Sequence, residues 1–433
     1  MKYIITNVQY NAGVNVNLLR NIKCFAKEHA VDEMLTFVQN GSYKDDDIID
    51  KRVFLGGFGT VDNLTLNKNL RLQDMKILAQ QINPMTGLAT KLSRDYSYII
   101  PSAKIRYLSV ANTSKHPRAL MTTGNLTKPN YKLHTAQGRK AESQHQYGFV
   151  FVEVVNGRIF KTYQIEAEKN GNFHYLNERY VEGKKRKAQP EAVILGDIHL
   201  GDTNPKAYKH SLECISTLKP KRVVLHDLFN GHSINPHEQG SLLSSIRNLQ
   251  GSRDSLEKEL KMVYKEICRL SKKFPKVQFI VAESNHDIFL QRYIDDKLFM
   301  DNAQNFLHVI NMIPEMLIGK KPTLQIGLEL FGDIPRNFYF GKVDEEQRVR
   351  GVELGYHGHN GLNGSRGSSA SFDRFNLRMI TAHEHSPKLY ANGMTVGTNT
   401  HLKLPYTKGC SSWMHANGIL YSDGKYGLLP FIV

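Results

Sequence analysis

The sequence predicts an α/β fold preceded by an additional α+β region. Between residues 191 and 317, short apolar segments alternate with amphipathic helical segments, which is typical of parallel strands joined by helices. From residue 324 onward the segments are strand-like and separated by turns, so a second, β-rich layer is expected. The chain has 433 residues, a length that corresponds to about two to three domains.

Six elements are predicted in the alternating region. Its strands are apolar runs of the length usual for buried strands, and its helices carry apolar residues near helical spacing. The strands are expected at 191–196, 222–226 and 276–282, and the helices at 208–218, 242–273 and 289–317. Parallel strands end at one edge of their sheet, and ligands bind beyond that edge.

Fewer elements can be assigned in the rest of the chain. The β-rich layer is expected to use strands at 324–328, 337–340, 354–357 and 379–382. Residues 1–190 are expected to form helices around 18–37 and 72–82, and strands at 96–100 and 147–155. Their sequence shows no spacing typical of a known nucleic-acid-binding module.

The stretch Glu182-Gly-Lys-Lys-Arg-Lys-Ala-Gln-Pro190 marks the predicted domain boundary. Like charges repel one another along such a run and Pro190 ends local structure, so we interpret it as a linker. The basic cluster could also contact phosphate or act as a nuclear-import signal. The predicted organisation is an N-terminal α+β domain at 1–181, a linker at 182–190 and a second domain at 191–433.

Positive charge is concentrated in the first part of the chain. The whole chain carries 57 Lys and Arg against 41 Asp and Glu, a net charge of +16. Residues 1–190 contain 28 basic and 16 acidic side chains. Between residues 91 and 140 there are ten basic side chains and one acidic side chain, Asp95. Such an excess favours a polyanionic partner, most simply nucleic acid, because each neutralised phosphate releases counterions. A generic basic surface that aids solubility is the alternative.

The four cysteines are far apart and form no CxxC pair, which excludes a zinc ribbon or a disulfide scaffold. No apolar run approaches the roughly 18 residues that a membrane helix needs. The first residues, MKYIITNVQY, lack the features of a signal peptide. We expect a cytoplasmic protein without a membrane partner, acting in the host cytoplasm if it is encoded by a phage.

Acids and histidines follow the predicted strands. A carboxylate and an imidazole placed two residues apart after a strand can hold one metal ion together. Five segments combine acidic, histidine or asparagine side chains that can bind a metal, and three of them come directly after predicted strands. They are GDIHLG with Asp197 and His199, HDLFNGH with Asp227, ESNHD with Asn285, His286 and Asp287, GYHGHNG with His357, and TAHEHS with His383 and His385.

In this order the segments resemble the motifs of the calcineurin-like metallophosphoesterase superfamily: DxH, GDxxD or GDxxx, GNHD, a histidine, and GHxH. The resemblance covers roughly residues 191–401, and DLFN is most similar to the double-strand-break repair nuclease branch or a phage-type DNase. Three glycines of the pattern are replaced, by His226, Ser284 and Ala382. The resemblance implies that residues 191–433 form a catalytic domain, a β-sandwich flanked by helices in four layers, α/β/β/α.

The resemblance also implies two divalent metal ions. Asp197, His199 and His385 would hold the first, and Asp227 would bridge to the second. Asn285, His357 and His383 would complete the second site. A mixed set of carboxylate, imidazole and amide ligands suits manganese first, with Fe, Zn or Mg as alternatives.

His286 is expected to be catalytic rather than a ligand. In the superfamily, this histidine donates a hydrogen bond or a proton to the phosphate or the leaving group. Asp287 would orient the ring and stabilise its charged form. Packing at the strand end is the alternative interpretation of His286.

We weigh three functions. The first is a two-metal phosphodiesterase that hydrolyses DNA by attack of a metal-activated hydroxide, a nuclease for DNA degradation or repair with little sequence specificity. The second is a phosphomonoesterase or small-molecule phosphodiesterase acting on nucleotides or phosphoproteins. The third is a non-enzymatic nucleic-acid-binding scaffold, whose signature would be lost metal ligands.

The basic N-terminal domain would hold the DNA. Three of its side chains are expected to contact nucleic acid: Arg118, Lys132 and Arg139. A homo-oligomer, most simply a dimer, is expected. The sequence does not indicate an ATPase partner, a polarity, or a choice between endonuclease and exonuclease action.

Overall fold

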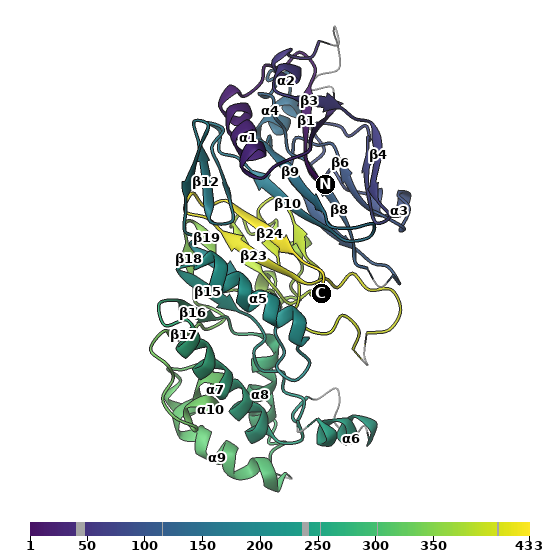
Figure 1. Cartoon of the computed structure of the whole chain (residues 1–433). Coiled ribbons are helices and arrows are strands. Elements are labelled where there is room, and N and C mark those ends of the chain that lie inside the picture. The colour runs from purple at the N-terminus through teal and green to yellow at the C-terminus, as the bar shows by residue number, and fades with distance from the viewer. Residues whose placement is uncertain (40–47, 115, 236–241, 252, 301, 405–406) are drawn as a thin grey trace.

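The computed structural model describes all residues except 40–47, 115, 236–241, 252, 301 and 405–406, and it shows a mixed α/β protein (Figure 1). The described residues form four sheets, of six, ten, five and three strands. None of these sheets closes into a barrel within the described part of the chain. The expected α/β class is therefore confirmed.

The six-stranded sheet is built by the second half of the chain. Its order is β17-β16-β15-β14-β23-β24, and β14 to β17 are parallel to one another. The strands are β14 (Ala192–Ile194), β15 (Arg222–Leu225), β16 (Gln278–Val281), β17 (Phe338–Phe340), β23 (Ala416–Leu420) and β24 (Tyr426–Pro430). The three predicted strands at 191–196, 222–226 and 276–282 are confirmed in this sheet.

Helices cover one face of this sheet (Figure 1). They are α5 (Pro205–Leu218), α7 (Leu256–Lys273), α8 (Asn285–Asp295), α9 (Ala303–Ile318) and α10 (Thr323–Glu329). Asn204 begins α5, because its side chain accepts hydrogen bonds from two main-chain N–H groups of the first turn and Pro205 follows it. In α7, Leu260, Val263 and Ile267 face the sheet and are fully buried.

The ten-stranded sheet lies against the other face. Its strands come from both halves of the chain, in the order β18-β19-β20-β22-β21-β7-β8-β6-β5-β4. They are β4 (Asn63–Asn67), β5 (Leu70–Gln73), β6 (Ser97–Ile100), β7 (Tyr107–Val110), β8 (Arg118–Thr122), β18 (Arg348–Val349), β19 (Val352–Glu353), β20 (Met379–Thr381), β21 (Lys388–Leu389) and β22 (Gly393–Thr395). Ile194, Val224 and Ile280 of the first sheet share a core with Met121 and Ile380 of the second.

The remaining strands belong to the first 187 residues. The five-stranded sheet has the order β10-β9-β1-β2-β3, and the small sheet has the order β11-β12-β13. They are β1 (Lys2–Gln9), β2 (Glu33–Gln39), β3 (Phe58–Thr60), β9 (Gly148–Val154), β10 (Phe160–Glu166), β11 (Phe173–Tyr175), β12 (Glu178–Val181) and β13 (Lys184–Lys187). Helix α1 (Val16–Glu28) packs on the larger sheet, with Phe25 among Phe149, Phe151 and Phe173.

The short helices lie at the margins of the fold. They are α2 (Arg52–Leu55), α3 (Leu88–Lys91), α4 (Ala136–Ser143), α6 (Leu242–Gln250), η1 (Leu362–Gly364) and α11 (Ser369–Phe372). The helix predicted at 242–273 is divided into α6 and α7, and α6 extends away from the helical layer (Figure 1).

Several predicted elements are wrong. The helix expected at 18–37 ends at Glu28, and β2 begins at Glu33. Residues 72–82 form the end of β5 and a loop rather than a helix, and residues 324–328 lie in α10 rather than in a strand. Short apolar runs of this kind fit both periodicities, and tertiary contacts decide between them.

The predicted linker at 182–190 contains a strand. β13 pairs with β12 in antiparallel register, and its four basic side chains are all exposed. Solvent exposure and the ion pairs of Lys185 with Glu28 and Glu178 offset the repulsion within this like-charged edge strand. The division of the chain at this point stays a prediction, and the two parts share the ten-stranded sheet.

Within the described residues, no helix is both long enough and apolar enough to cross a bilayer.

Candidate metal centre

The predicted site residues lie just past the carboxyl ends of neighbouring strands. Asp197 follows β14, Asp227 follows β15, and Asn285 follows β16 as the first residue of α8. His357 follows β19, and His383 follows β20. Because β14, β15 and β16 are parallel, their loops emerge at one edge, where the ten-stranded sheet brings in the late histidines.

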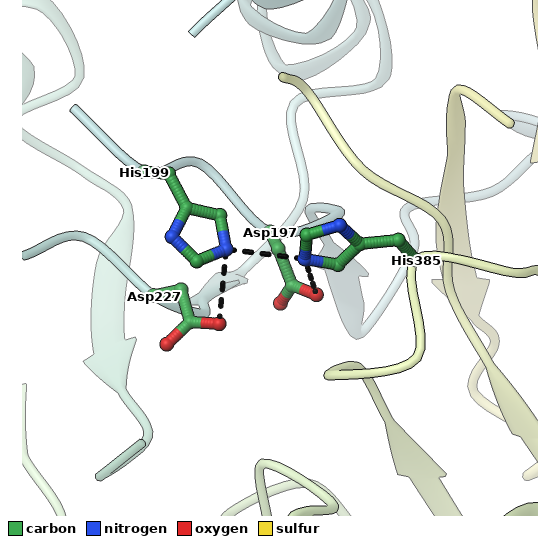
Figure 2. Close-up of side chains that lie close together, drawn as sticks. All are labelled: Asp197, His199, Asp227 and His385. Carbon is green, nitrogen blue, oxygen red and sulfur yellow. Dashed lines mark hydrogen bonds and ion pairs between the residues drawn. The ribbon is translucent and has the colours of Figure 1, made fainter. Parts of the chain in front are cut away.

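Four of these side chains form a compact group, which we call the metal-ligand group: Asp197, His199, Asp227 and His385 (Figure 2). One potential ligand atom from each lies within 4.8 Å of those of the others, and all four residues are buried. His199 Nε2 is 3.2 Å from Asp227 Oδ2 and 3.1 Å from His385 Nε2. His385 Nε2 in turn is 3.1 Å from Asp197 Oδ2.

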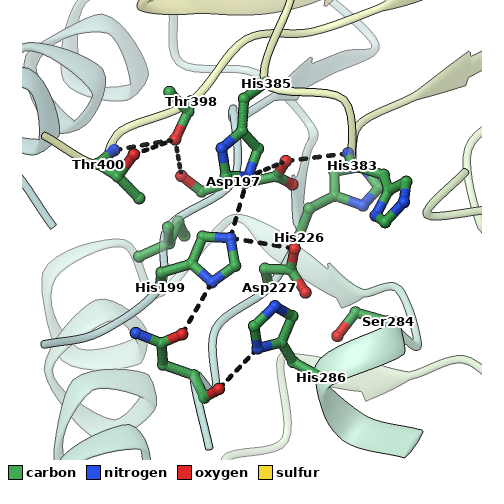
Figure 3. A network of polar contacts seen from close by, with 12 residues as sticks. Asp197, His199, His226, Asp227, Ser284, His286, His383, His385, Thr398 and Thr400 are labelled. Atoms are coloured by element: carbon green, nitrogen blue, oxygen red, sulfur yellow. Dashed lines mark hydrogen bonds and ion pairs between the residues drawn. The ribbon is translucent and has the colours of Figure 1, made fainter. Parts of the chain in front are cut away.

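The other predicted ligands surround Asp227. His357 Nε2 lies 3.2 Å from Asp227 Oδ2 and 3.1 Å from Asn285 Oδ1. His383 donates its main-chain N–H to Asp197 Oδ2 at 2.9 Å (Figure 3). The ring of His383 lies 5.2 Å from that of His357. The structure therefore brings all seven predicted ligands into one neighbourhood, with the Asp227 carboxylate between two imidazoles.

The backbone at this site is strained. His199, Asp227, His383 and His385 have φ angles of +45°, +47°, +71° and +55°. A residue other than glycine held in this region costs about 1–3 kcal/mol, and such residues cluster at functional sites. The fold therefore keeps four of the seven side chains in place against a local conformational preference.

The electrostatics favour bound cations. Burial alone would raise the pKa of the Asp197 carboxyl, but the neighbouring His385 keeps that pKa below its usual value. Burial likewise would lower the pKa of His357, yet Asp227 and Asp197 raise it to about 9. Asp197 Oδ1 and Asp227 Oδ1 are buried and accept no hydrogen bond from a described residue, and His357 Nδ1 lies 3.8 Å from Asp197 Oδ1. Buried carboxylate oxygens need a positive partner, and a metal ion supplies one.

His286 lies beside this group, and its ring is 4.6 Å from the ring of His199 (Figure 3). Its Nδ1 is 2.6 Å from the main-chain oxygen of Asn230, which can only accept, so Nδ1 carries the hydrogen. Burial lowers the pKa of His286 to about 4. The ring is therefore neutral at neutral pH.

The structure does not support the expected pairing of Asp287 with His286. Asp287 Oδ2 accepts the main-chain N–H of Ser284 at 2.9 Å, and Ser284 Oγ accepts the N–H of Asp287 at 3.3 Å. This is a capping box at the start of α8. The S-x-x-D spacing of residues 284–287 is the sequence signal for it. Burial raises the pKa of the Asp287 carboxyl to about 7.

Asn230, in the loop after β15, was not predicted to belong to the site. Asn230 Oδ1 lies 3.2 Å from His199 Nδ1, and Asn230 Nδ2 lies 3.1 Å from Asp202 Oδ2. The asparagine directly after the DLF sequence is the signal that could have identified this contact.

The three predicted nucleic-acid contacts are placed differently from one another. Arg118 is only 7% exposed, because β8 lies inside the ten-stranded sheet, so its guanidinium is not presented to a large partner. Lys132 and Arg139 are exposed, before and within α4. Lys132 lines a cavity of about 690 Å³ at the carboxyl ends of β1 and β2.

Buried cations also reduce the predicted basic surface. Besides Arg118, Lys104 and Arg106 are 3% and 4% exposed. Lys104 donates to the main-chain oxygens of Ala79 and Gln81, and Arg106 donates to Gln146 Oε1 at 2.9 Å. Lys115 lies outside the described residues. Within residues 91–140, the excess of basic residues is thus partly structural.

Comparison with known proteins gives one informative match. The chain is 27% identical to "Protein A1" of Escherichia phage T5 over 461 aligned residues, which span 99% of this chain and 82% of that protein. No family model matches the chain, and no solved structure does. The alignment therefore spans both the basic first half and the segments that form the candidate metal centre.

Proposed function

We propose that the protein is a metal-dependent phosphodiesterase that hydrolyses DNA with little sequence specificity. The observation that carries the proposal is the metal-ligand group, in which two buried carboxylates and two imidazoles converge from three separate parts of the chain. Buried acidic groups of this kind, perturbed by burial and by specific partners, mark functional sites.

The surroundings of the group support the metallophosphoesterase interpretation. Helices cover one face of the six-stranded sheet, and the ten-stranded sheet covers the other. These supply three of the four layers of the α/β/β/α arrangement that we infer, with the site at the carboxyl ends of the parallel strands. "Protein A1" belongs to a phage, so a phage-encoded homologue would act in the host cytoplasm.

The donors fit two divalent cations. Asp197, His199 and His385 would hold one, and Asn285, His357 and His383 would hold the other, with Asp227 shared. The donor set of oxygen and imidazole nitrogen suits manganese, with iron, zinc or magnesium as alternatives. Bound there, the cations would lower the pKa of a water molecule and neutralise phosphate oxygens.

His286 would act on the substrate. With Nδ1–H held by the oxygen of Asn230, its Nε2 is the nitrogen left for the site. The negative charge of a bound phosphodiester raises the pKa of an adjacent imidazole. His286 would then hold a proton on Nε2 and deliver it to the departing oxygen.

The second candidate is a phosphomonoesterase or a small-molecule phosphodiesterase with the same centre. The exposed basic residues Lys132 and Arg139 favour DNA, because a small phosphate needs no extended basic surface. A homodimer on DNA is part of the proposal, and an ATPase partner is not.

The deciding experiment compares four substrates. The metal-free protein is supplied with Mn²⁺ and incubated with linear DNA, plasmid DNA, a chromogenic phosphodiester and a chromogenic monoester. We expect cleavage of both DNAs and of the diester, and loss of all three in Asp197→Ala. Glu213→Ala, exposed on α5 and paired with Lys209, is the control that should cleave normally. Intact DNA alongside rapid turnover of the monoester would establish the second candidate instead.

A further inference from the structure

Asn230 contacts two histidines of the site through different groups. Its side-chain Oδ1 lies 3.2 Å from Nδ1 of His199, and its main-chain oxygen lies 2.6 Å from Nδ1 of His286. Carbonyl oxygens only accept, so each imidazole must carry its hydrogen on Nδ1. Nε2 of His199, the atom that faces Asp227 and His385, is then the nitrogen that a bound cation would find available.

Asp202 determines which way the Asn230 amide points. Asn230 Nδ2 lies 3.1 Å from Asp202 Oδ2. A carboxylate can only accept, so the NH₂ end of the amide must face Asp202 and the oxygen end must face His199. The tautomer of His199 that can bind a metal is thus determined by the carboxylate of Asp202, which acts through Asn230 and makes no contact with His199 itself.

Arg253 holds Asp202 in turn. Its NH1 donates to Asp202 Oδ1 at 2.6 Å, which leaves Oδ2 for Asn230. Gly201 allows the arginine to lie close, because a Cβ there would lie 3.0 Å from Arg253 Cδ, and the φ of Gly201 is +104°. His232 Nε2, 3.0 Å from Asp202 Oδ2 and 2.7 Å from Asn230 Nδ2, completes the cluster.

We propose that Asn230, oriented by Asp202 and Arg253, is a positioning residue that keeps Nε2 of His199 directed at the metal centre. The same residue aligns His286 through its main chain. The inference rests on the proposed function only in taking His199 as a metal ligand. Hydrogen-bonding partners of metal-bound histidines typically contribute a factor of about 10 to 100 in metal affinity.

An exchange of the two side chains tests this arrangement. In Asp202→Asn, the new amide oxygen accepts the hydrogen bond from Arg253, so the new NH₂ group faces Asn230. Asn230 then turns its own NH₂ toward His199, which forces the hydrogen onto Nε2. In Asn230→Asp, two carboxylates face each other. The double variant D202N/N230D restores a donor facing an acceptor and has the net charge of the original protein.

The first measurement is the protonated nitrogen of His199 in the protein loaded with Zn²⁺, which is diamagnetic, read from imidazole ¹⁵N shifts and assigned by the signal lost in His199→Gln. We expect Nδ1–H in the original protein and in the double variant, and Nε2–H in Asp202→Asn. Nδ1–H in all of them would overturn the proposal. This result is independent of any nuclease activity.

The second measurement is Mn²⁺ affinity. Trp413 is the only tryptophan of the chain and its ring lies 4.2 Å from that of His385, so quenching of its fluorescence reports binding. Each single variant should bind about 10-fold to 100-fold more weakly, and the double variant should recover most of the loss. The matched control, Glu191→Gln, changes a carboxylate that is 3% exposed and paired with Lys221, and it should bind as the original protein does.

Two outcomes separate this inference from the proposed function. The positioning role would be refuted if the single variants bound Mn²⁺ as tightly as the original protein. It would also be refuted if the double variant bound Mn²⁺ more weakly than both single variants. A protein that shows the expected binding pattern and still leaves DNA intact would refute the nuclease and keep the positioning role.

Discussion

Charged side chains are arranged differently in the candidate metal centre and in the basic first half of the chain. At the centre, carboxylates and imidazoles from distant segments point at one another. A single atom, Asp227 Oδ2, lies 3.2 Å from Nε2 of His199 and 3.2 Å from Nε2 of His357. In the first half, some cations are buried within sheets, as Arg118 is, while others, such as Lys132, are exposed. Side chains that converge on one point define a candidate binding site, whereas an excess of basic residues indicates only a preference for anionic partners.

The largest effect is expected from Asp227→Ala. The change removes the one carboxylate that both halves of the centre share, so at least one bound metal should be lost. Because a metal ion supplies several kcal/mol of transition-state stabilisation, DNA cleavage should fall by about 10³-fold or more. Metal content by mass spectrometry and cleavage of plasmid DNA check this. Full metal content with full activity would mean that the shared carboxylate is not a ligand.

His286→Ala should separate chemistry from metal binding within the centre. Its ring lies beside His199, yet its Nδ1 bonds to the oxygen of Asn230 and not to a ligand. We expect activity to fall by about 10²-fold at unchanged metal content, the usual contribution of a general acid or base. His210→Ala, on the exposed side of α5, is the control. Loss of both metals in His286→Ala would contradict the role assigned to it.

In the first half, His145 should make stability depend on pH. It is buried between the Tyr131 hydroxyl and the main-chain oxygen of Thr127, and burial lowers its pKa to about 4. Between about pH 6.5 and 4 the unfolded chain therefore binds a proton that the folded protein does not, so stability is lost as the pH falls. The loss amounts to at most about 3 kcal/mol.

The check is the urea midpoint measured across this pH range for the original protein and His145→Gln. The variant should show a shallower decline. Equal slopes would show that other groups dominate acid sensitivity.

The smallest effect is expected on DNA affinity. Reversing Lys132 and Arg139 to Glu should weaken binding and reduce the slope of log affinity against log salt by about two, one for each lost phosphate contact. Lys209→Glu, on the exposed face of α5, is the control for charge alone. Titration of labelled DNA at several salt concentrations measures this. An unchanged slope would remove α4 and its preceding loop from the DNA-binding surface.

Arg118 sharpens the comparison further. Because it is buried in the sheet, Arg118→Glu should lower the urea midpoint and leave the salt slope of the folded protein unchanged, unlike the reversal at Lys132 and Arg139.

The sequence predicts the parallel strands and the positions of the candidate ligands for the same reason. A buried parallel strand is a continuous apolar run, and the polar residue that follows it is fixed at the sheet edge, as Asp197 and Asp227 are. Residues 324–328 are also apolar but too short for periodicity to distinguish strand from helix, and contacts with α7, α8 and α9 make them helical.

Roles that depend on side-chain direction could not be predicted. Asp287 adjoins His286 in sequence, yet the first turn of α8 directs its carboxylate back to Ser284. Asn230 lies 31 residues from His199 and is joined to it only by the fold. Burial of Arg118 likewise depends on which strands pair with β8, and composition carries no information on pairing.

The pairing of β7 with β21 has a consequence for how the protein is made. Tyr107 and Leu108 pair with Leu389 and Lys388, so β7 keeps an unpaired edge until those two distant residues have been synthesised. Exposed edges of this kind invite association with other nascent chains. We expect slow translation of the segment between β7 and β21 to lower the soluble yield of the protein.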